Sequence, residues 1–201
     1  ESRHPVTIIT KNALIERDLP ILQDLAVQGL VQVVISLATL DANLARKMDP
    51  RAPSPKRRLQ TMQTLTDAGV PVAVLAAPII PGLNDADLER ILAAAQAVGV
   101  RQAGYTLLRL PYELQNLFAD WLQLHYPLKA QHVLNLLEQA HQDTDKKQQF
   151  GTRMRGTGPI ADLLRQRFKL ACRRLGLQTS HSALRTDLFV RPALNGQMSL
   201  F

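Results

Sequence analysis

The chain has 201 residues, a length that suits one domain with its own core, and 46% of them are hydrophobic whereas 4% are aromatic. No apolar run reaches the ~18–20 residues of a membrane span, and the first residues lack the order of a signal peptide, so no membrane partner is expected. A single cysteine excludes an internal disulfide and any zinc or iron–sulfur motif, so the cytoplasm is the expected compartment.

The net charge of +7 comes from the last quarter of the chain. Residues 1–150 hold 15 basic and 15 acidic side chains, whereas residues 151–201 hold nine basic and two acidic ones. Such a segregated basic segment is typical of proteins that bind a polyanion such as DNA or RNA. The same segment is equally compatible with a solvated face that keeps the protein soluble.

Short aliphatic runs alternate with helical patterns up to about residue 125. The predicted strands are 6–10, 31–37, 70–77 and 103–110. Each is so uniformly apolar that we expect both of its faces to be covered. The predicted helices between them are 18–28, 55–68 and 86–98, with Ser54 and Asp85 as N-caps. Repeated strand–helix units predict a parallel sheet, and since four strands cannot close a barrel, one edge is expected to be open.

Beyond Pro111 the strand pattern stops. Helical patterns cover 114–124 and 130–141, and a basic, glycine-rich loop at 151–158 precedes a helix over 159–175. The apolar face predicted for this last helix consists of Ile160, Leu163, Leu164, Phe168, Ala171, Cys172 and Leu175. The predicted fold class is therefore α/β. It comprises a partial (β/α) barrel over 1–125, a helical extension over 126–176 and an extended basic tail over 177–201.

Polar side chains stand where each predicted strand ends. The first strand ends at Thr10 and Lys11, the second carries Ser36 and Thr39, and the third is followed by a turn that reaches Asn84 and Asp85. In parallel α/β folds, ligands bind at the carboxyl ends of the strands, so these residues predict a site on that edge. The alternative is that they are turn and packing residues of an ordinary α/β barrel.

The order of three segments resembles the second half of a radical S-adenosylmethionine (SAM) barrel of the spore-photoproduct-lyase-like, or DNA repair photolyase, group. The segments are 33–39, 49–54 and 76–85, and the resemblance covers about 5–125, extending in the closer subgroup to about 176. It implies strands three to six of a SAM-dependent, lyase-like [4Fe–4S] radical enzyme. Its Cys-x₃-Cys-x₂-Cys cluster loop is absent from this sequence. We therefore expect the C-terminal portion of an enzyme, whose partner would be the missing N-terminal half of the barrel.

The resemblance also implies which residues contact SAM. Thr10, Lys11 and Ser36 match SAM-contacting positions, and a lysine ammonium suits the amino-acid carboxylate of SAM. Asp49 stands where family members usually have Glu in an acidic-x-Arg-x-x-Ser element, and the run from Ala77 to Ile80 resembles the strand end beside the adenine. The expected cofactor-binding residues are Thr10, Lys11, Ser36, Thr39, Arg51, Pro78, Ile79 and Ile80. No catalytic residue and no metal ligand is assigned.

Two further motifs lie in the basic quarter. The arginines of the glycine-rich loop precede a helix N-terminus, an arrangement that suits a phosphate, and the alternative is an ordinary loop with solvated arginines. The expected phosphate or nucleic-acid residues are Arg153, Arg155, Arg165, Lys169 and Arg173.

The chain ends with Gln197, Met198, Ser199, Leu200 and Phe201, which match four of five positions of the bacterial sliding-clamp pentapeptide Gln-Leu-Ser/Asp-Leu-Phe. The alternative for these last residues is that they pack on the chain's own core. The competing interpretation of the whole chain is a non-catalytic module that binds DNA or a sliding clamp.

Overall fold

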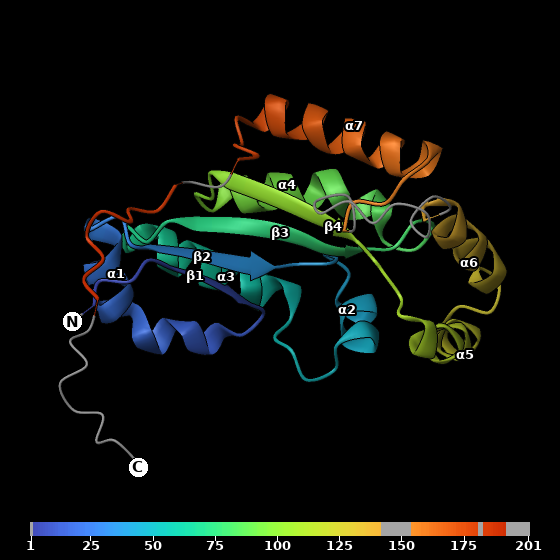
Figure 1. The fold of residues 1–201 in the computed structure, drawn as a ribbon. Helices are drawn as coiled ribbons and strands as arrows, with labels where there is room; N and C mark the ends of the chain where they lie inside the picture. The colour runs from blue at the N-terminus through green and yellow to red at the C-terminus, as the bar shows by residue number, and fades with distance from the viewer. Residues whose placement is uncertain (1, 142–153, 181–182, 192–201) are drawn as a thin grey trace, which may run out of the picture.

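The structure, a computed structural model, describes residues 2–141, 154–180 and 183–191 (Figure 1). Its centre is a parallel sheet in the strand order β1-β2-β3-β4. The strands are β1 (Val6–Thr10), β2 (Val31–Ser36), β3 (Val72–Ile79) and β4 (Gln102–Leu107). Each neighbouring pair is parallel, with Ile8 beside Val33 and Val34 beside Ala73, so all four carboxyl ends lie at one edge of the sheet. The predicted α/β class with parallel strands is confirmed.

Seven α-helices lie within the described residues, together with three short 3-10 helices. The α-helices are α1 (Leu19–Val27), α2 (Ala42–Met48), α3 (Pro55–Asp67), α4 (Leu88–Ala97), α5 (Gln115–His125), α6 (Ala130–Gln139) and α7 (Pro159–Leu175). The 3-10 helices are η1 (Ala13–Asp18), η2 (Asp85–Asp87) and η3 (Tyr112–Leu114). The Ser54 hydroxyl accepts a hydrogen bond from the Arg57 amide at 3.3 Å and caps α3, as predicted. Among the described helices, none combines the length and the apolar content needed to cross a bilayer.

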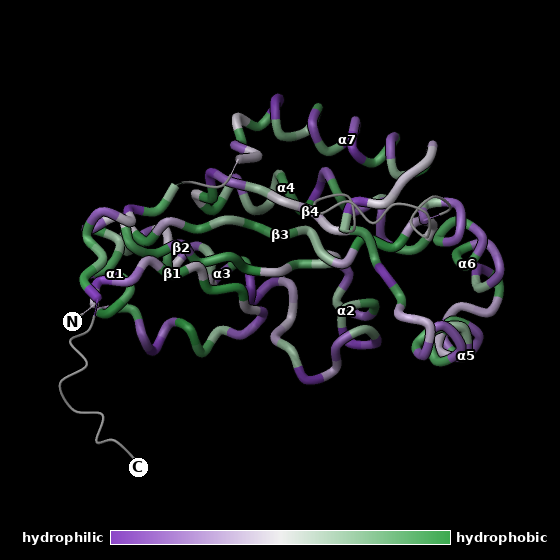
Figure 2. The backbone as a smooth tube through the Cα atoms, in the orientation of Figure 1, coloured by the Kyte–Doolittle hydropathy of each residue, from purple (hydrophilic) through white to green (hydrophobic). Residues whose placement is uncertain are grey.

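The main core lies between the sheet and the helices that follow its strands. It is built from alternate strand residues such as Val33, Ile35 and Val74, together with the inward faces of α3, α4 and α7. Figure 2 shows hydrophobic residues concentrated along the sheet and polar residues interspersed along α7. Every residue of β2 is buried, but β1 alternates, and Ile9 is 64% exposed. The prediction that both faces of every strand are covered is therefore wrong for β1, whose alternate residues Thr7 and Ile9 are exposed.

A second core lies beyond the carboxyl end of the sheet and holds α5 and α6 in place. It consists of the buried residues Ile80, Leu122, Ala130, Val133 and Leu137. The Trp121 indole adds a hydrogen bond of 3.2 Å to the Lys47 carbonyl of α2. Figure 1 shows α2, α5 and α6 together at this end, so three helices surround the edge at which a ligand is expected.

Helix α7 runs antiparallel to β4 and lies beside α4. At its N-terminal end the Leu107 amide donates to the Met154 carbonyl at 3.0 Å, and beyond its C-terminal end the Ala103 amide donates to the Gln178 carbonyl at 2.9 Å. Most of its predicted apolar face is buried, but Leu163 is 55% exposed, so the prediction was wrong for that residue. The two ends of α7 therefore lie at opposite ends of the sheet.

Candidate functional site

A pocket of about 120 Å³ opens at the carboxyl ends of β1, β2 and β3. Its walls come from the residues that follow β1 and β2, from the end of β3, and from α2 and α3. They are Lys11, Leu37, Ala38, Thr39, Ala45, Met48, Asp49, Pro55, Arg58, Ala77 and Pro78. The structure thus brings together three predicted cofactor residues, Lys11, Thr39 and Pro78, on the edge where parallel α/β folds bind ligands.

An ion pair at this pocket joins two segments that are far apart in the sequence. The Lys11 ammonium lies 2.6 Å from Oδ2 of Asp49, the residue that caps the C-terminus of α2. The same carboxylate oxygen is 4.0 Å from the Arg58 guanidinium. One acidic group therefore lies between two cations, which leaves a net positive charge for an anionic or zwitterionic ligand. The Lys11 side chain is 48% exposed, so it is free to reorient toward a ligand.

Arg58 is the most deeply buried charged residue of the pocket. Its Nε donates to the Pro53 carbonyl at 2.9 Å, and an Nη donates to the Ser36 carbonyl at 3.0 Å. Burial lowers the pKa of this guanidinium, and the charge of Asp49 opposes that shift. An arginine in a helix rich in basic residues is usually exposed, so the sequence alone gives no sign that Arg58 is buried.

The predicted hydroxyl ligands are engaged in hydrogen bonds within the protein. The Ser36 hydroxyl donates to the Ala77 carbonyl at 3.1 Å, and that of Thr39 donates to the Asp87 carboxylate. The Thr10 hydroxyl accepts from the Asn12 amide at 2.9 Å. Ser36 and Thr10 are not among the residues that line the pocket. The Ser36 and Thr39 hydroxyls would have to give up these bonds in order to donate to a ligand, whereas the Thr10 hydroxyl only accepts and keeps its own proton for a ligand.

The strand end expected beside an adenine contributes two residues, Ala77 and Pro78, to the pocket. A cis peptide bond joins Ala77 to Pro78, and Pro78 lines the pocket. Ile79 and Ile80 are buried in the main and the second core respectively, so their side chains cannot stack on a purine. The predicted Arg51 is exposed and is not part of the lining.

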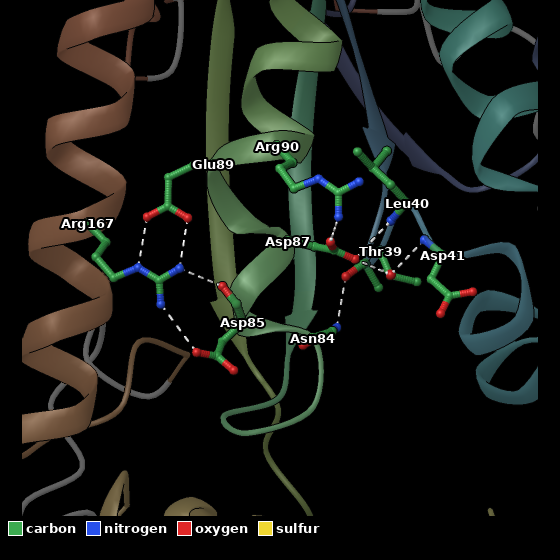
Figure 3. A network of polar contacts seen from close by, with 10 residues as sticks. Thr39, Leu40, Asp41, Asn84, Asp85, Asp87, Glu89, Arg90 and Arg167 are labelled. Atoms are coloured by element: carbon green, nitrogen blue, oxygen red, sulfur yellow. Dashed lines mark hydrogen bonds and ion pairs between the residues drawn. The ribbon is translucent and has the colours of Figure 1, made fainter.

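Two buried or part-buried polar residues, Asn84 and Asp87, bond to the segment that follows β2 (Figure 3). Asn84 is 2% exposed, and its side-chain amide donates to the Ala38 carbonyl at 2.8 Å. Asp87 accepts from the Thr39 hydroxyl and from the Leu40 amide. Both residues hold the segment after β2. Asn84 was among the polar residues expected at this edge, whereas Asp87 was not, because its partner Thr39 is 48 positions away.

The segment 84–89, which leads into α4 and carries Asn84 and Asp87, is attached to α7 on its other side. Arg167 forms two hydrogen bonds with the Glu89 carboxylate, of 2.8 and 2.7 Å, and a further bond of 3.2 Å with Asp85. Figure 3 shows Asp85 and Glu89 turned toward Arg167, and Asp87 turned toward Thr39. The hydrogen bond from Arg167 lowers the pKa of Glu89.

The residues present do not fit a [4Fe–4S] cluster. Cys172 is the one cysteine of the sequence; it is buried in the core contributed by α7, and burial raises the pKa of its thiol to about 11. Within the described ranges, no three His, Cys, Asp or Glu side chains are grouped so that they could hold a metal ion. A cluster of this type is usually held by thiolates, so its ligands are not among these residues.

The predicted phosphate residues are divided between the two ends of α7. Arg155 and Arg165 lie toward its N-terminal end, and Arg165 pairs with Asp162 at 2.5 Å. Lys169 and Arg173 lie toward its C-terminal end, at the amino end of the sheet, and both are exposed. Arg153 and the predicted clamp-binding residues Gln197, Met198, Ser199, Leu200 and Phe201 lie outside the described residues.

Comparison with known proteins gives a match to one superfamily. Residues 1–95 match the model of the radical SAM superfamily. The chain is 36% identical over 128 residues to uncharacterized proteins of Mycobacterium bovis and Mycobacterium tuberculosis, a match that covers 61% of this chain and 37% of each relative. It is also 36% identical over 100 residues to an uncharacterized protein of Acidianus two-tailed virus, covering 47% of this chain and 33% of that protein.

The chain spans a little over a third of the length of the curated relatives it matches. The matched residues include β1 to β3 and most of α4. The mixed α/β fold with a four-stranded parallel sheet is consistent with a partial β/α barrel of the radical SAM type.

Proposed function

We propose that this chain supplies part of the SAM-binding site of a radical SAM enzyme of the spore-photoproduct-lyase-like group. The observation that carries the proposal is that all residues lining the pocket fall between positions 11 and 78, inside the segment that matches the superfamily model. The pocket also opens at the carboxyl end of the sheet, where parallel α/β folds bind their ligands.

The charges of the pocket suit the amino-acid part of SAM, which carries a carboxylate and an ammonium group. Lys11 would bind the carboxylate, and Asp49 would bind the ammonium, so that the ligand replaces their mutual ion pair. Arg58 would place a second positive charge beside the Asp49 carboxylate, and Pro78 would offer an apolar wall to the remainder of the molecule. When SAM is bound beside a reduced cluster it supplies radical chemistry, and that step is not assigned to residues of this chain because the cluster ligands are absent from it.

Calorimetric titration with SAM tests this assignment. Lys11→Ala is expected to weaken SAM binding by about 1.5–3 kcal/mol, the usual contribution of a hydrogen bond to a charged group. Lys129→Ala removes the same charge from an exposed position between α5 and α6 and should leave the affinity unchanged. Equal affinities of the wild type and Lys11→Ala would remove Lys11 from the site.

A second candidate function, binding of a polyanion such as DNA or RNA, rests on the charge of the last quarter of the chain. The side chains of Lys169, Arg173 and Arg174 are exposed at the C-terminal end of α7, and Arg101 is exposed at the adjacent start of β4. A surface of this kind attracts phosphate backbones without reading sequence. It fits either a nucleic-acid substrate of the enzyme or a non-catalytic nucleic-acid-binding module.

The sliding-clamp interaction stays a prediction about residues 197–201. A peptide of this sequence is expected to bind a bacterial clamp with micromolar affinity, about −8 kcal/mol, because Leu200 and Phe201 can fill an apolar groove. Replacing both residues with alanine should abolish binding. Lack of binding by the wild-type peptide would leave the motif without function.

A further inference from the structure

The turn that follows β3 contains a buried amide that bonds to two strand ends at once. Asn84 is 2% exposed and stands five residues beyond the end of β3. Its Oδ1 accepts from the Ile80 amide at 2.6 Å, and its Nδ2 donates to the Ala38 carbonyl at 2.8 Å and to the Pro78 carbonyl at 2.9 Å. One side chain therefore makes three hydrogen bonds with the backbone of two separate segments.

Both segments form the wall of the pocket. Ala38 and Pro78 are lining residues, and they follow β2 and end β3 respectively. Strand pairing does not join Ala38 to Pro78, because the β2–β3 ladder ends at the pair of Ser36 and Leu75. The Leu37 amide adds one last bond to the Leu75 carbonyl at 2.9 Å. Beyond that point, the spacing between the two walls depends on side chains.

From these contacts we infer that Asn84 is a positioning residue, whose amide sets the separation of the two pocket walls and thereby the affinity for the ligand. The chemistry requires an amide: a carboxylate could accept from Ile80 but would face the carbonyl oxygens of Ala38 and Pro78 without a proton to donate. Asp87 supports the same wall through Thr39, one residue further along. The inference rests on the proposed function, since the ligand is SAM or a compound that shares its nucleoside and amino-acid parts.

A purely structural role would give a different result from a positioning role. Removing a buried hydrogen-bonding group lowers the stability of the fold wherever it lies. It changes the affinity of the folded molecules only when the pocket itself is altered. Thr66 offers a matched control, because its part-buried hydroxyl donates to the Val98 carbonyl at 2.7 Å and links the C-terminal ends of α3 and α4, at the opposite end of the sheet.

The experiment compares the wild type with Asn84→Ala, Asn84→Asp and Thr66→Val. The dissociation constant for S-adenosylhomocysteine, a stable analogue that needs no cluster, is measured well below the melting temperature of every variant. Both Asn84 variants are expected to bind at least about tenfold more weakly, and Thr66→Val should bind like the wild type. Affinity of Asn84→Asp should recover in part when the pH is lowered enough to protonate the new carboxyl group, because the acid can then donate one bond.

Hydrogen exchange in the absence of ligand separates this inference from the proposed function. Amides at 38–40 and at Ile80 should exchange faster in Asn84→Ala than in the wild type, and should be unchanged in Thr66→Val. Wild-type binding with unchanged affinity in Asn84→Ala would overturn the inference. If the wild type does not bind the ligand, the proposed function and the ligand-affinity part of the inference are both overturned. Faster exchange confined to those amides of Asn84→Ala would still establish that Asn84 holds the two pocket walls together. Exchange of these amides at the wild-type rate in Asn84→Ala would refute this structural role as well.

Discussion

The two ends of the sheet hold their charged side chains in opposite ways. At the carboxyl end, Lys11, Asp49 and Arg58 form a partly buried group with bonds to neighbouring backbone. At the amino end, Lys169 and Arg173 extend into solvent from the last turns of α7. Paired, partly buried charges are typical of a site built for one small ligand, whereas exposed cations of one sign attract polyanions over several ångströms. The two proposed activities are therefore expected to be separable by mutation.

The largest expected effect is on the binding of an iron–sulfur cluster, which this chain should not show at all. Neither end of the sheet offers three thiolates, and the thiol of Cys172 has a pKa raised to about 11 by burial. Anaerobic reconstitution with iron and sulfide should therefore leave the chain without cluster absorption. Stoichiometric iron with the visible absorption of a cluster would contradict the assignment of the cluster ligands to residues outside this chain.

The next effect is on stability at the carboxyl end. Arg58→Met is expected to lower the free energy of unfolding by about 3 kcal/mol, because the carbonyls of Ser36 and Pro53 lose their charged donor. Urea unfolding followed by circular dichroism measures the change. Arg46→Met, on the exposed side of α2, is the matched control and should cost little. Similar losses in the two variants would show that the burial of Arg58 does not stabilise the pocket.

At the amino end the expected effect is on nucleic-acid binding and its salt dependence. Replacing Lys169, Arg173 and Arg174 together with glutamine should lower the affinity for short duplex DNA at low salt about tenfold or more. The slope of log K against log salt should become shallower by about one for each DNA phosphate that the variant no longer neutralises. The control replaces Lys47, Lys56 and Lys129, which carry the same total charge outside α7. If both triple variants lose the same affinity for DNA, the effect comes from the net charge of the chain and not from the position of these residues on α7.

The smallest effect concerns the link between α4 and α7. Arg167→Met should cost about 1 kcal/mol at neutral pH, because the ion pair with Glu89 is partly exposed. Arg167 lowers the pKa of Glu89 below its usual 4.5, so the stabilisation is complete above that value and is lost as the pH falls through the lowered pKa. The difference between wild type and variant should therefore shrink in acid. A difference that stays constant down to low pH would show that the pair contributes only packing.

The order of the four strands and of the other described α-helices could be predicted because each of these elements carries its own local pattern, but α2 (Ala42–Met48) was not predicted. The boundaries predicted for β1 and α7 agree with the structure, since Val6–Thr10 is a compact β-branched run and Pro159 and Gly176 delimit the helix. The exposure of Ile9 could not be predicted, because whether an apolar strand is covered depends on its neighbours in the sheet.

For the candidate site, the sequence could indicate that it lies at the carboxyl edge of the sheet, but it could not show which side chains form hydrogen bonds there. Lys11 and Pro78 were identified because they follow strands, and both line the pocket. Asn84 was expected at this edge because it follows the third strand, but Arg58 and Asp87 were missed because their importance comes from partners on other segments, which local spacing does not show. Ile79 and Ile80 were assigned through the family resemblance, as a backbone edge beside the adenine, and the structure places both side chains in cores.

The most direct test of the account is to locate S-adenosylhomocysteine on the isotope-labelled chain by nuclear magnetic resonance. The account predicts that saturating ligand shifts the amide resonances of 11–12, 37–40, 76–77 and 79–80, at the carboxyl end of the sheet, and leaves those of 169–175 in place. Shifts confined to the C-terminal turns of α7, or no saturable shifts at all, would contradict the assignment of the pocket to SAM.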